Sequence, residues 1–576
     1  MTKSADVIFI HPPSVFDFRK KPIFFGPMAD LVPSSHIFDM YPIGFVNLGA
    51  SLEEAGFSTR IVNLAALMLL SPKFDVCKFI SALSGDIFCI DLHWLPHAQG
   101  ALEVASVIKK IKPGARIILG GYSASYYHEE LIRMEQVDYV IRGDSAEEPL
   151  CALISSIKNG KALDSVANLT WKSDGEVIIN DFSCGSLNLN QKLLDYFYMI
   201  RMALRNLDFR GVVPFANWRS YPVVMAESCR GCTMCCVTCG GSAFSSRKIF
   251  GRSIPAYLDP ELLARQLLII SRYFRSPIFL LGDINQAGRD YVELFFRAVR
   301  PMRIKNPVMF EFFNPPPENF FELAAKSFGD IYYEMSIDSH EPGVREMVGK
   351  FYSNVDVKDT IAGAFSAGAR RFDLYFMIGL PNQTFESVIE TPEFCQDLYL
   401  QLNGDRRLFV FTSAVAPFVD PGSRAFEEPE RYGYRLRFKS LAEHAEAMLS
   451  PSWKYMLNYD TAWMSRDKIV ESTYMCSAGL NRLKGRVGCI SEQEMISIER
   501  RIEMSLDLMN KIDDIYMRGE NSSSRQELMQ LKPLMDELNN FTIINKYEIS
   551  MKTRCSNFVM GNIIHDLMFG PKDWKQ

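Results

Sequence analysis

The sequence feature that most constrains the fold is a repeated alternation of short β-branched runs with helical segments. In the first 160 residues, the runs that are typical of strands are 7–10, 59–63, 87–91, 116–119 and 139–141. Alternation of this kind builds parallel strands joined by crossover helices. Residues 1–160 are therefore predicted to form a doubly wound, Rossmann-like α/β sheet that binds ligands beyond the carboxyl ends of its strands.

A second βα series follows residues 161–215, which we predict to be a linker with a hairpin at 168–179. Within residues 216–420 the predicted strands are 223–227, 278–281, 308–313, 332–337, 372–378 and 409–413. Six βα units without a seventh or eighth indicate a partial (β/α)6 barrel with its active site at the carboxyl ends of the strands. Residues 421–576 have a mainly helical pattern, and 521–524 (Asn-Ser-Ser-Ser) is typical of a flexible surface loop.

Composition limits the classes of partner. The chain has 576 residues, of which 48% are hydrophobic and 23% charged, as in folded multidomain proteins. Its 63 Lys and Arg residues against 68 Asp and Glu residues give a net charge of -5, which offers no general attraction to nucleic acid. The apolar runs are shorter than the ~20 residues of a membrane-spanning helix, and the chain opens on a strand-like segment. These features predict a cytoplasmic enzyme without a transmembrane segment.

Five of the 13 cysteines lie between Cys229 and Cys239, and this cluster can be interpreted in more than one way. Cys229, Cys232, Cys235 and Cys239 give the C-x2-C-x2-C-x3-C spacing of a ferredoxin cluster with four thiolates. Cys232, Cys236 and Cys239 give C-x3-C-x2-C, which leaves one iron open. A structural zinc site is a third interpretation. The remaining eight cysteines are predicted to be small core residues: Cys77, Cys89, Cys151, Cys184, Cys395, Cys476, Cys489 and Cys555.

Three observations favour the open-iron interpretation. Gly240 follows Cys239 where the ferredoxin motif has proline, no second cysteine set supplies a partner cluster, and the segment follows the first barrel strand. A zinc site needs four closed ligands and does not explain the Gly240-Gly241 pair. The metal ligands predicted from the sequence are therefore Cys232, Cys236 and Cys239.

With its Arg230-Gly231-Cys232 lead-in, the chain resembles, over residues 1–420, the radical S-adenosylmethionine (SAM) enzymes that carry an N-terminal cobalamin-binding domain. The resemblance implies a 4Fe-4S cluster whose open iron is chelated by the amino and carboxylate groups of SAM. Reductive cleavage of SAM then gives a 5'-deoxyadenosyl radical, a chemistry that belongs to the cofactors. The resemblance also implies a small-molecule substrate and an external electron donor such as flavodoxin or ferredoxin.

The same resemblance assigns SAM-binding roles at successive strand ends. Gly282-Asp283 is similar to the family's Gly-Gly-Glu-type motif, so Asp283 is expected to meet the SAM amino group. Ser336 and Asp338 are expected to bind the ribose or carboxylate, with Arg345 as a carboxylate partner. Gly379, in Ile-Gly-Leu-Pro, is expected in the turn against adenine.

In the first domain the resemblance implies bound cobalamin. It does not decide whether a protein group ligates cobalt on the lower face of the corrin. The segment from Asp91 to Pro96 begins like the Asp-x-His-x-x-Gly signature of other cobalamin folds but has Pro96 in place of glycine. We therefore expect the loop with His93 and Trp94 to cover the lower face of the corrin without a firm bond to cobalt, with His93 ligation as the rival. The glycines expected to approach the ligand closely are Gly120, Gly121 and Gly143. A degenerate domain that binds no cobalamin is a further alternative.

The predicted reaction is C-methylation of an unactivated carbon. Alternatives are radical carbon-carbon bond formation or cyclisation on a lipid or tetrapyrrole and, in another class, a ferredoxin-type electron carrier or ligand sensor. Glu311 ends the third barrel strand and is a candidate catalytic residue facing substrate or SAM. Nearby phenylalanines could line an apolar pocket, but such runs more often form core: Phe310, Phe312, Phe313, Phe320 and Phe321.

Overall fold

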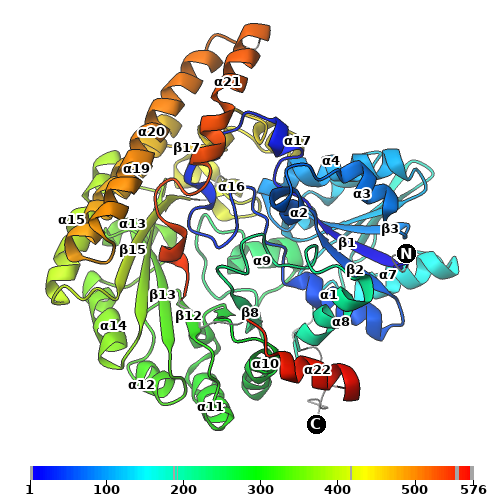
Figure 1. Cartoon of the computed structure of the whole chain (residues 1–576), viewed down its shortest axis with the longest axis horizontal. Coiled ribbons are helices and arrows are strands. Elements are labelled where there is room, and N and C mark those ends of the chain that lie inside the picture. The colour runs from blue at the N-terminus through cyan, green and yellow to red at the C-terminus, as the bar shows by residue number, and fades with distance from the viewer. Residues whose placement is uncertain are drawn as a thin grey trace.

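The computed structural model describes residues 4–183, 185, 188–190, 193–415, 418–519, 521–551 and 557–570. Two mainly parallel sheets, each covered by helices, lie beside one another, and long C-terminal helices extend along the far side of the second sheet (Figure 1). Within the described residues, no helix combines the length and apolar character needed to cross a bilayer.

The first sheet has the predicted doubly wound architecture. Its strand order is β2-β1-β3-β4-β5-β6-β7, and the first five strands are parallel. These strands are β1 (Val7–His11), β2 (Thr59–Asn63), β3 (Ile87–Asp91), β4 (Arg116–Gly120) and β5 (Tyr139–Ile141). Every residue of β1, β2 and β3 is buried, as expected when helices cover both faces. The helices are α1 (Gly44–Glu54) and α7 (Glu147–Asn159) on one face, and α3 (Val76–Ala82) and α4 (Ala98–Ile111) on the other (Figure 1).

The hairpin predicted as part of a linker instead extends this sheet. Strand β6 (Leu169–Ser173) pairs antiparallel with β5, and β7 (Glu176–Ile179) pairs with β6. The free edge of β5 offers unpaired backbone donors and acceptors, which the hairpin satisfies. Helix α8 (Tyr196–Asn206) also packs on the first domain, where the Tyr198 hydroxyl lies 2.7 Å from the Thr59 hydroxyl.

The second sheet confirms the partial barrel. Six parallel strands are paired in chain order: β8 (Val224–Glu227), β11 (Ile278–Leu281), β12 (Val308–Phe312), β13 (Ile331–Asp338), β14 (Arg371–Ile378) and β15 (Leu408–Ala414). Helices between the strands are α10 (Pro260–Tyr273), α11 (Arg289–Val299), α12 (Phe320–Ala325), α14 (Asn354–Ser366) and α15 (Phe385–Gln401). Phe310, Phe312, Phe320 and Phe321 are buried and stack edge to face, so they are core residues.

The C-terminal region is helical, as predicted, with α19 (Arg466–Val487), α20 (Glu492–Tyr516), α21 (Ser522–Leu538) and α22 (Met560–Phe569). Residues 521–524 are not a flexible loop. The Asn521 side chain accepts from the Ser524 N–H and caps α21, a favourable role for asparagine. Helix α19 packs against α15 and β15, and the short helix η7 (Lys546–Ile549) returns the chain to the barrel, where Lys484 and Glu548 form a buried ion pair.

The scattered cysteines follow the core prediction only in part. Cys89, Cys395 and Cys476 are buried, Cys151 and Cys489 are half-buried, and Cys77 is exposed on α3. The prediction is wrong for Cys77, since its helix buries only the residues that face the sheet. Cys184 and Cys555 lie outside the described residues.

Candidate functional site

The carboxyl ends of both sheets open into one cavity of about 840 Å³. Because ligands bind at this end of parallel sheets, the arrangement places two ligand-binding edges face to face. Lining residues from the first sheet are Asp91, His93, Gly120, Gly121 and Gly143; those from the second are Gly282, Glu311, Ser336 and Asp338. Of the sequence-predicted residues, Trp94, Asp283, Arg345 and Gly379 do not line it.

The cysteine loop crosses this cavity after β8. Cys229 and Arg230 form the short strand β9, which pairs with β10 (Ala256–Tyr257), and the loop ends at α9 (Ala243–Phe250). Cys232, Cys236 and Cys239 line the cavity together with Cys229, whereas Cys235 lies outside its wall. The ferredoxin spacing requires Cys235, so the loop geometry favours the three-cysteine set.

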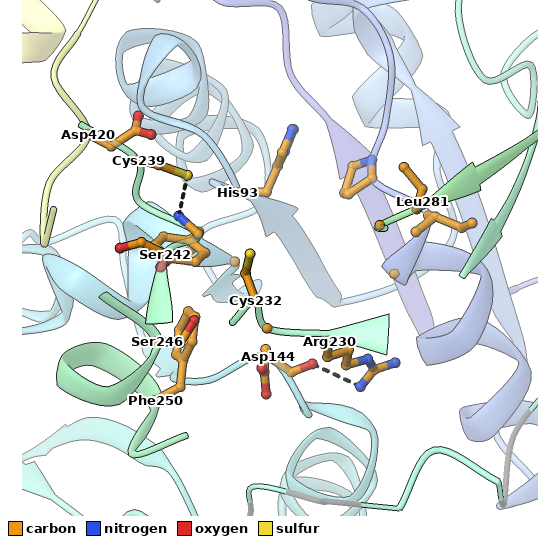
Figure 2. Close-up of a pocket in the computed structure, with 18 of the residues that line it drawn as sticks. His93, Asp144, Arg230, Cys232, Cys239, Ser242, Ser246, Phe250, Leu281 and Asp420 are labelled. Atoms are coloured by element: carbon orange, nitrogen blue, oxygen red, sulfur yellow. Dashed lines mark hydrogen bonds between the residues drawn. The ribbon is translucent and has the colours of Figure 1, made fainter. Parts of the chain in front are cut away.

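Backbone donors already point at two of these sulfurs. The Met234 N–H lies 3.3 Å from Cys232 Sγ. The Gly241 N–H lies 3.2 Å from Cys239 Sγ, the contact dashed at Cys239 in Figure 2. Hydrogen bonds of this type stabilise thiolate ligands and tune cluster potentials. Burial raises the pKa of Cys236 to about 11 and raises that of Cys232, so metal binding must displace protons from these thiols.

The thiols are not gathered for a single metal ion. In the part of the chain that the structure describes, the sets of ligand atoms within 4.8 Å of one another are His11/Asp91/His93 and His340/Glu341/Glu390, with no cysteine in either. A tetrahedral zinc site with Zn–S bonds of about 2.3 Å would bring its sulfurs closer than this. The spacing therefore fits a larger group than one zinc ion.

The end of β13 brings polar groups to the barrel side of the cavity. Asp338 has φ of 68°, a left-handed conformation that a non-glycine residue adopts at some cost, next to a register shift between Ser336 and Asp338. Lys350 Nζ lies 2.9 Å from the Asp338 carboxylate and also donates to the Ser336 carbonyl. Burial lowers the pKa of Lys350, but Asp338 outweighs this effect and raises it overall. Lys350 was not predicted, because no motif spacing marks it.

Glu311 and Asp283 lie near each other but have different surroundings. The Glu311 carboxylate lines the cavity and accepts the Gly282 N–H at 3.1 Å; burial raises its pKa to about 7. Asp283 is buried in its own loop, where its oxygens accept the Asn285 N–H at 3.0 Å and the Phe313 N–H at 3.1 Å. The Asp283 carboxylate, which was expected to meet the SAM amino group, therefore caps a turn of its own loop.

Arg345 and Gly379 also have internal partners. Arg345 is fully buried and donates to the Ser339 carbonyl at 2.7 Å and the Tyr352 carbonyl at 3.0 Å. Gly379 has φ of 94°, and a Cβ there would lie 2.7 Å from the Tyr459 hydroxyl. The Gly379 turn therefore fits against the C-terminal region, while its neighbours Met377 and Leu380 face the cavity.

A histidine–aspartate network occupies the strand ends of the first domain. Asp91 lies 2.9 Å from His11 Nδ1 through one oxygen and 2.5 Å from His93 Nδ1 through the other. Burial alone would raise the pKa of Asp91, but the two imidazoles outweigh it and lower the pKa well below its usual value. With Nδ1 held by Asp91, the half-exposed His93 keeps Nε2 for a ligand in the cavity (Figure 2).

The predicted glycines differ in what they permit. Gly121 has φ of 109°, and a Cβ there would lie 2.5 Å from His93 Cα, so glycine allows the His93 loop to cross the end of β4. A Cβ at Gly120 would lie 3.7 Å from the Ile141 carbonyl oxygen, an ordinary contact, and Gly143 faces Phe182. Trp94 packs edge to face on Phe38 and lines a separate, smaller cavity. From these strand ends the main cavity continues between the sheet and helices α1 and α7, along Cys89, Ile118, Leu119, Ile141 and Leu150.

Two arginines join the domains below the cysteine loop. Arg252 donates from Nε and Nη2 to the Asp144 carboxylate at 2.6 and 2.7 Å. Arg230 donates to the Asp144 carbonyl (Figure 2). It also pairs with Glu147 and Glu227. The sequence marked Arg230 only as part of the motif before Cys232. Its ion pairs with the other domain join residues far apart in the chain, so no sequence motif indicates them.

Asp420 and Gln286 support the loop from the barrel side. Asp420 accepts the Gly240 N–H at 2.9 Å, and burial raises its pKa to about 6. Gln286 accepts the Thr233 N–H at 2.8 Å, and its side-chain amide lies 3.5 Å from Cys232 Sγ. Neither residue was predicted from the sequence.

Comparison with known proteins agrees with this two-part site. Residues 35–154 match the model of the B12 binding domain, and residues 227–395 match that of the radical SAM superfamily. A curated relative, the anaerobic magnesium-protoporphyrin IX monomethyl ester cyclase of Synechocystis sp. (strain ATCC 27184 / PCC 6803 / Kazusa), is 20% identical over 246 residues. That match covers 42% of this chain and 45% of the relative, less than half of either.

Solved structures share the fold over most of the chain. The radical SAM methyltransferase TsrM from Kitasatospora setae, with tryptophan substrate and a SAM analogue bound, has a TM-score of 0.57 at 14% identity, covering 85% of this chain and 90% of TsrM. The cobalamin-dependent SAM radical enzyme OxsB, with aqua-cobalamin and SAM bound, has a TM-score of 0.55 at 13% identity, covering 98% of this chain and 80% of OxsB. A further TsrM structure holds cobalamin and a [4Fe-4S] cluster. The cofactor set expected from the sequence is thus the set found in these structural neighbours.

Proposed function

Because this chain is a radical SAM protein with an N-terminal B12-binding domain, we propose that it is a methyltransferase that uses SAM and cobalamin to methylate an unactivated carbon of a small molecule. The observation that carries the proposal is the single cavity shared by the cysteine loop and the strand ends of the B12-binding domain. Methyl transfer through a corrin requires the cluster with its SAM and the corrin to reach one substrate, and a shared cavity allows this. The name of TsrM, a radical SAM methyltransferase, supports the same reaction class.

Cys232, Cys236 and Cys239 would hold the cluster, and three thiolates leave one iron for SAM. When bound, the cluster supplies the electron that cleaves SAM and the corrin supplies the methyl carrier. The N–H donors of Met234 and Gly241 stabilise two of the thiolates.

The barrel side binds and orients SAM. Ser336, Asp338 and Lys350 present a hydroxyl, a carboxylate and an ammonium at one strand end, which suits a ribose and an amino-acid carboxylate. Glu311 is better placed than Asp283 to accept from the SAM amino group, because both Asp283 oxygens already accept N–H groups of its loop.

His93 is the proposed contact to the lower face of the corrin. The Asp91 carboxylate holds Nδ1 and so fixes the orientation of the ring, as carboxylates commonly do behind metal-bound histidines. The hydrogen bond between His93 and Asp91 favours His93 as a ligand of cobalt over the open lower face that was expected because of Pro96.

Ring formation on a tetrapyrrole is the second candidate reaction, and the cyclase similarity supports it. Both candidates require an external one-electron donor, which we propose to be a flavodoxin or ferredoxin. The non-enzymatic alternative, an electron carrier, would have no use for an open iron.

Anaerobic reconstitution with iron, sulfide and cobalamin, followed by dithionite and SAM, tests the proposal. We expect SAM to be converted to 5'-deoxyadenosine or S-adenosylhomocysteine, with Cys235→Ala active and Cys236→Ala inactive. An intact cluster without either product would instead identify an electron carrier. S-adenosylhomocysteine distinguishes methyl transfer from ring formation, which consumes no methyl group.

A further inference from the structure

A second cavity of about 350 Å³ lies inside the barrel, below the cysteine-lined one. Its walls come from β8, β11, β12, β13 and β14, from residues 31–40, and from the segment after η7. His93 lines both cavities and is the residue through which they adjoin. At about 30 Å³ per water-sized group, the space suits a ligand of roughly a dozen non-hydrogen atoms.

Glu334 and Tyr375 are among the polar side chains that face this space without a hydrogen-bond partner. Glu334 on β13 and Tyr375 on β14 both line the cavity. Among the residues that the structure describes, neither the Glu334 carboxyl nor the Tyr375 hydroxyl has a hydrogen bond or an ion pair. Buried polar groups are normally satisfied, so a pair left open toward a cavity indicates a ligand with complementary groups.

The charged groups around Glu334 indicate the charge of that ligand. Glu334 is directly opposite Glu311 on β12 and Asp373 on β14. Burial, and then the two neighbouring carboxylates, raise the pKa of Glu334 well above its usual value. The nearby Arg371 is already engaged by Asp373 and by the Glu548 carbonyl. The Glu334 carboxyl therefore stays protonated until a cation lies beside it, and a cationic ligand would allow it to ionise.

The other titratable groups of the cavity do not supply this cation. Lys546 is still charged at pH 7, since burial lowers its pKa only to about 8, but its ammonium donates to the Ser34 carbonyl at 2.6 Å and is not among the charges that shift the pKa of Glu334. His97 is neutral at pH 7, since burial lowers its pKa to about 3. His93 Nδ1 is held by Asp91.

Apart from Ser34, Tyr221 and Ser550, the remaining walls are apolar, polarizable and partly aromatic. Met225, Phe279 and Met309 line the space on the barrel side, and Phe38 and Trp94 line it on the other. Aromatic faces attract cations, and thioethers adapt to aromatic or aliphatic ligands.

We propose that the second cavity binds the ammonium group and apolar body of a small primary amine, with the ammonium between the Glu334 carboxylate and the Tyr375 hydroxyl. This site goes beyond the function proposed above, since it adjoins the shared cavity only at His93. It does not depend on that function, because its walls include none of the three cluster cysteines.

Calorimetric titration of the full, anaerobically reconstituted chain with 2-phenylethylamine, and with the neutral isostere 2-phenylethanol, tests the site. We expect the amine to bind with release of a proton from Glu334, seen as a heat that depends on the buffer. Loss of the charged contact lowers affinity about tenfold or more in Glu334→Gln, and less in Tyr375→Phe. Glu318→Gln removes an exposed carboxylate and should bind as the parent does.

Three results would overturn the inference: no binding of the amine to the parent at millimolar concentration, equal affinity in Glu334→Gln, or equal affinity for the alcohol. Tyr375→Phe provides a second reading if Glu334→Gln does not fold. SAM turnover by the parent, assayed in the same preparation, tests the proposed function separately. Amine binding without SAM turnover would keep the site and refute the methyltransferase.

Discussion

The ion pair between Arg252 and Asp144 holds the cysteine loop against the B12-binding domain, so breaking it tests how the shared cavity is built. Arg252 follows α9, Asp144 follows β5, and two hydrogen bonds of 2.6 and 2.7 Å join them. The Arg252 side chain is 2% exposed and that of Asp144 is 19% exposed. Asp144→Asn removes the charge while keeping the shape.

The expected loss of stability is about 2 kcal/mol. Breaking a fully buried pair costs about 3–5 kcal/mol because the remaining charge stays buried. The partial exposure of Asp144 lowers this figure, since water screens the carboxylate. A loss of about 2 kcal/mol corresponds to a fall of about 4–8 °C in the unfolding midpoint of the affected domain.

Calorimetry of the parent, Asp144→Asn and a surface control measures this loss, and gel filtration measures retained cobalamin. The control is Glu293→Gln, which breaks an exposed pair with Arg289 and should cost about 0.3 kcal/mol. We expect Asp144→Asn to lower both the midpoint and the retained cobalamin. If its midpoint falls no further than that of Glu293→Gln, the pair is not a structural clamp and the reasoning is refuted.

Further predictions follow from individual residues. Cys236→Ala should lose the iron–sulfur absorbance while Cys235→Ala keeps it, and the opposite result would restore the ferredoxin spacing. His93→Ala should abolish nitrogen superhyperfine splitting in the electron paramagnetic resonance spectrum of cob(II)alamin, whereas a parent spectrum without splitting would restore the open lower face. Burial raises the pKa of Asp30 from 3.8 to about 6, so its ionisation destabilises the folded state as pH rises through this window. Asp30→Asn should therefore flatten the dependence of unfolding temperature on pH between about 4 and 6, and an unchanged slope would contradict the assignment.

The strands were predictable because parallel strands buried on both faces have near-continuous apolar sequences. All five first-domain strands and all six barrel strands lie where β-branched and aromatic runs predicted them. The hairpin β6–β7 was recognised locally, but its pairing with β5 depends on a free sheet edge that sequence does not display.

Site residues were predictable where their spacing along the chain identifies a ligand set, and not where only the fold brings them together. Cys232, Cys236 and Cys239 have a recognisable spacing, and all three line the cavity. Lys350 and Glu334 have no recognisable spacing, since their roles arise from neighbours on other strands. Asp283 resembles its family counterpart in position, yet its carboxylate caps the loop that follows β11, a local competition that a motif cannot reveal.

The central claim is that the cluster and cobalamin occupy one cavity, and their magnetic interaction tests it most directly. The measurement is the electron paramagnetic resonance spectrum of cob(II)alamin in the holoenzyme, recorded before and after one-electron reduction of the cluster. The account predicts that the cobalt signal broadens when the cluster becomes paramagnetic, and that it does not change in Cys236→Ala. A cobalt signal that stays the same in the parent, while the reduced cluster is present in full, would place the two groups apart and contradict the account.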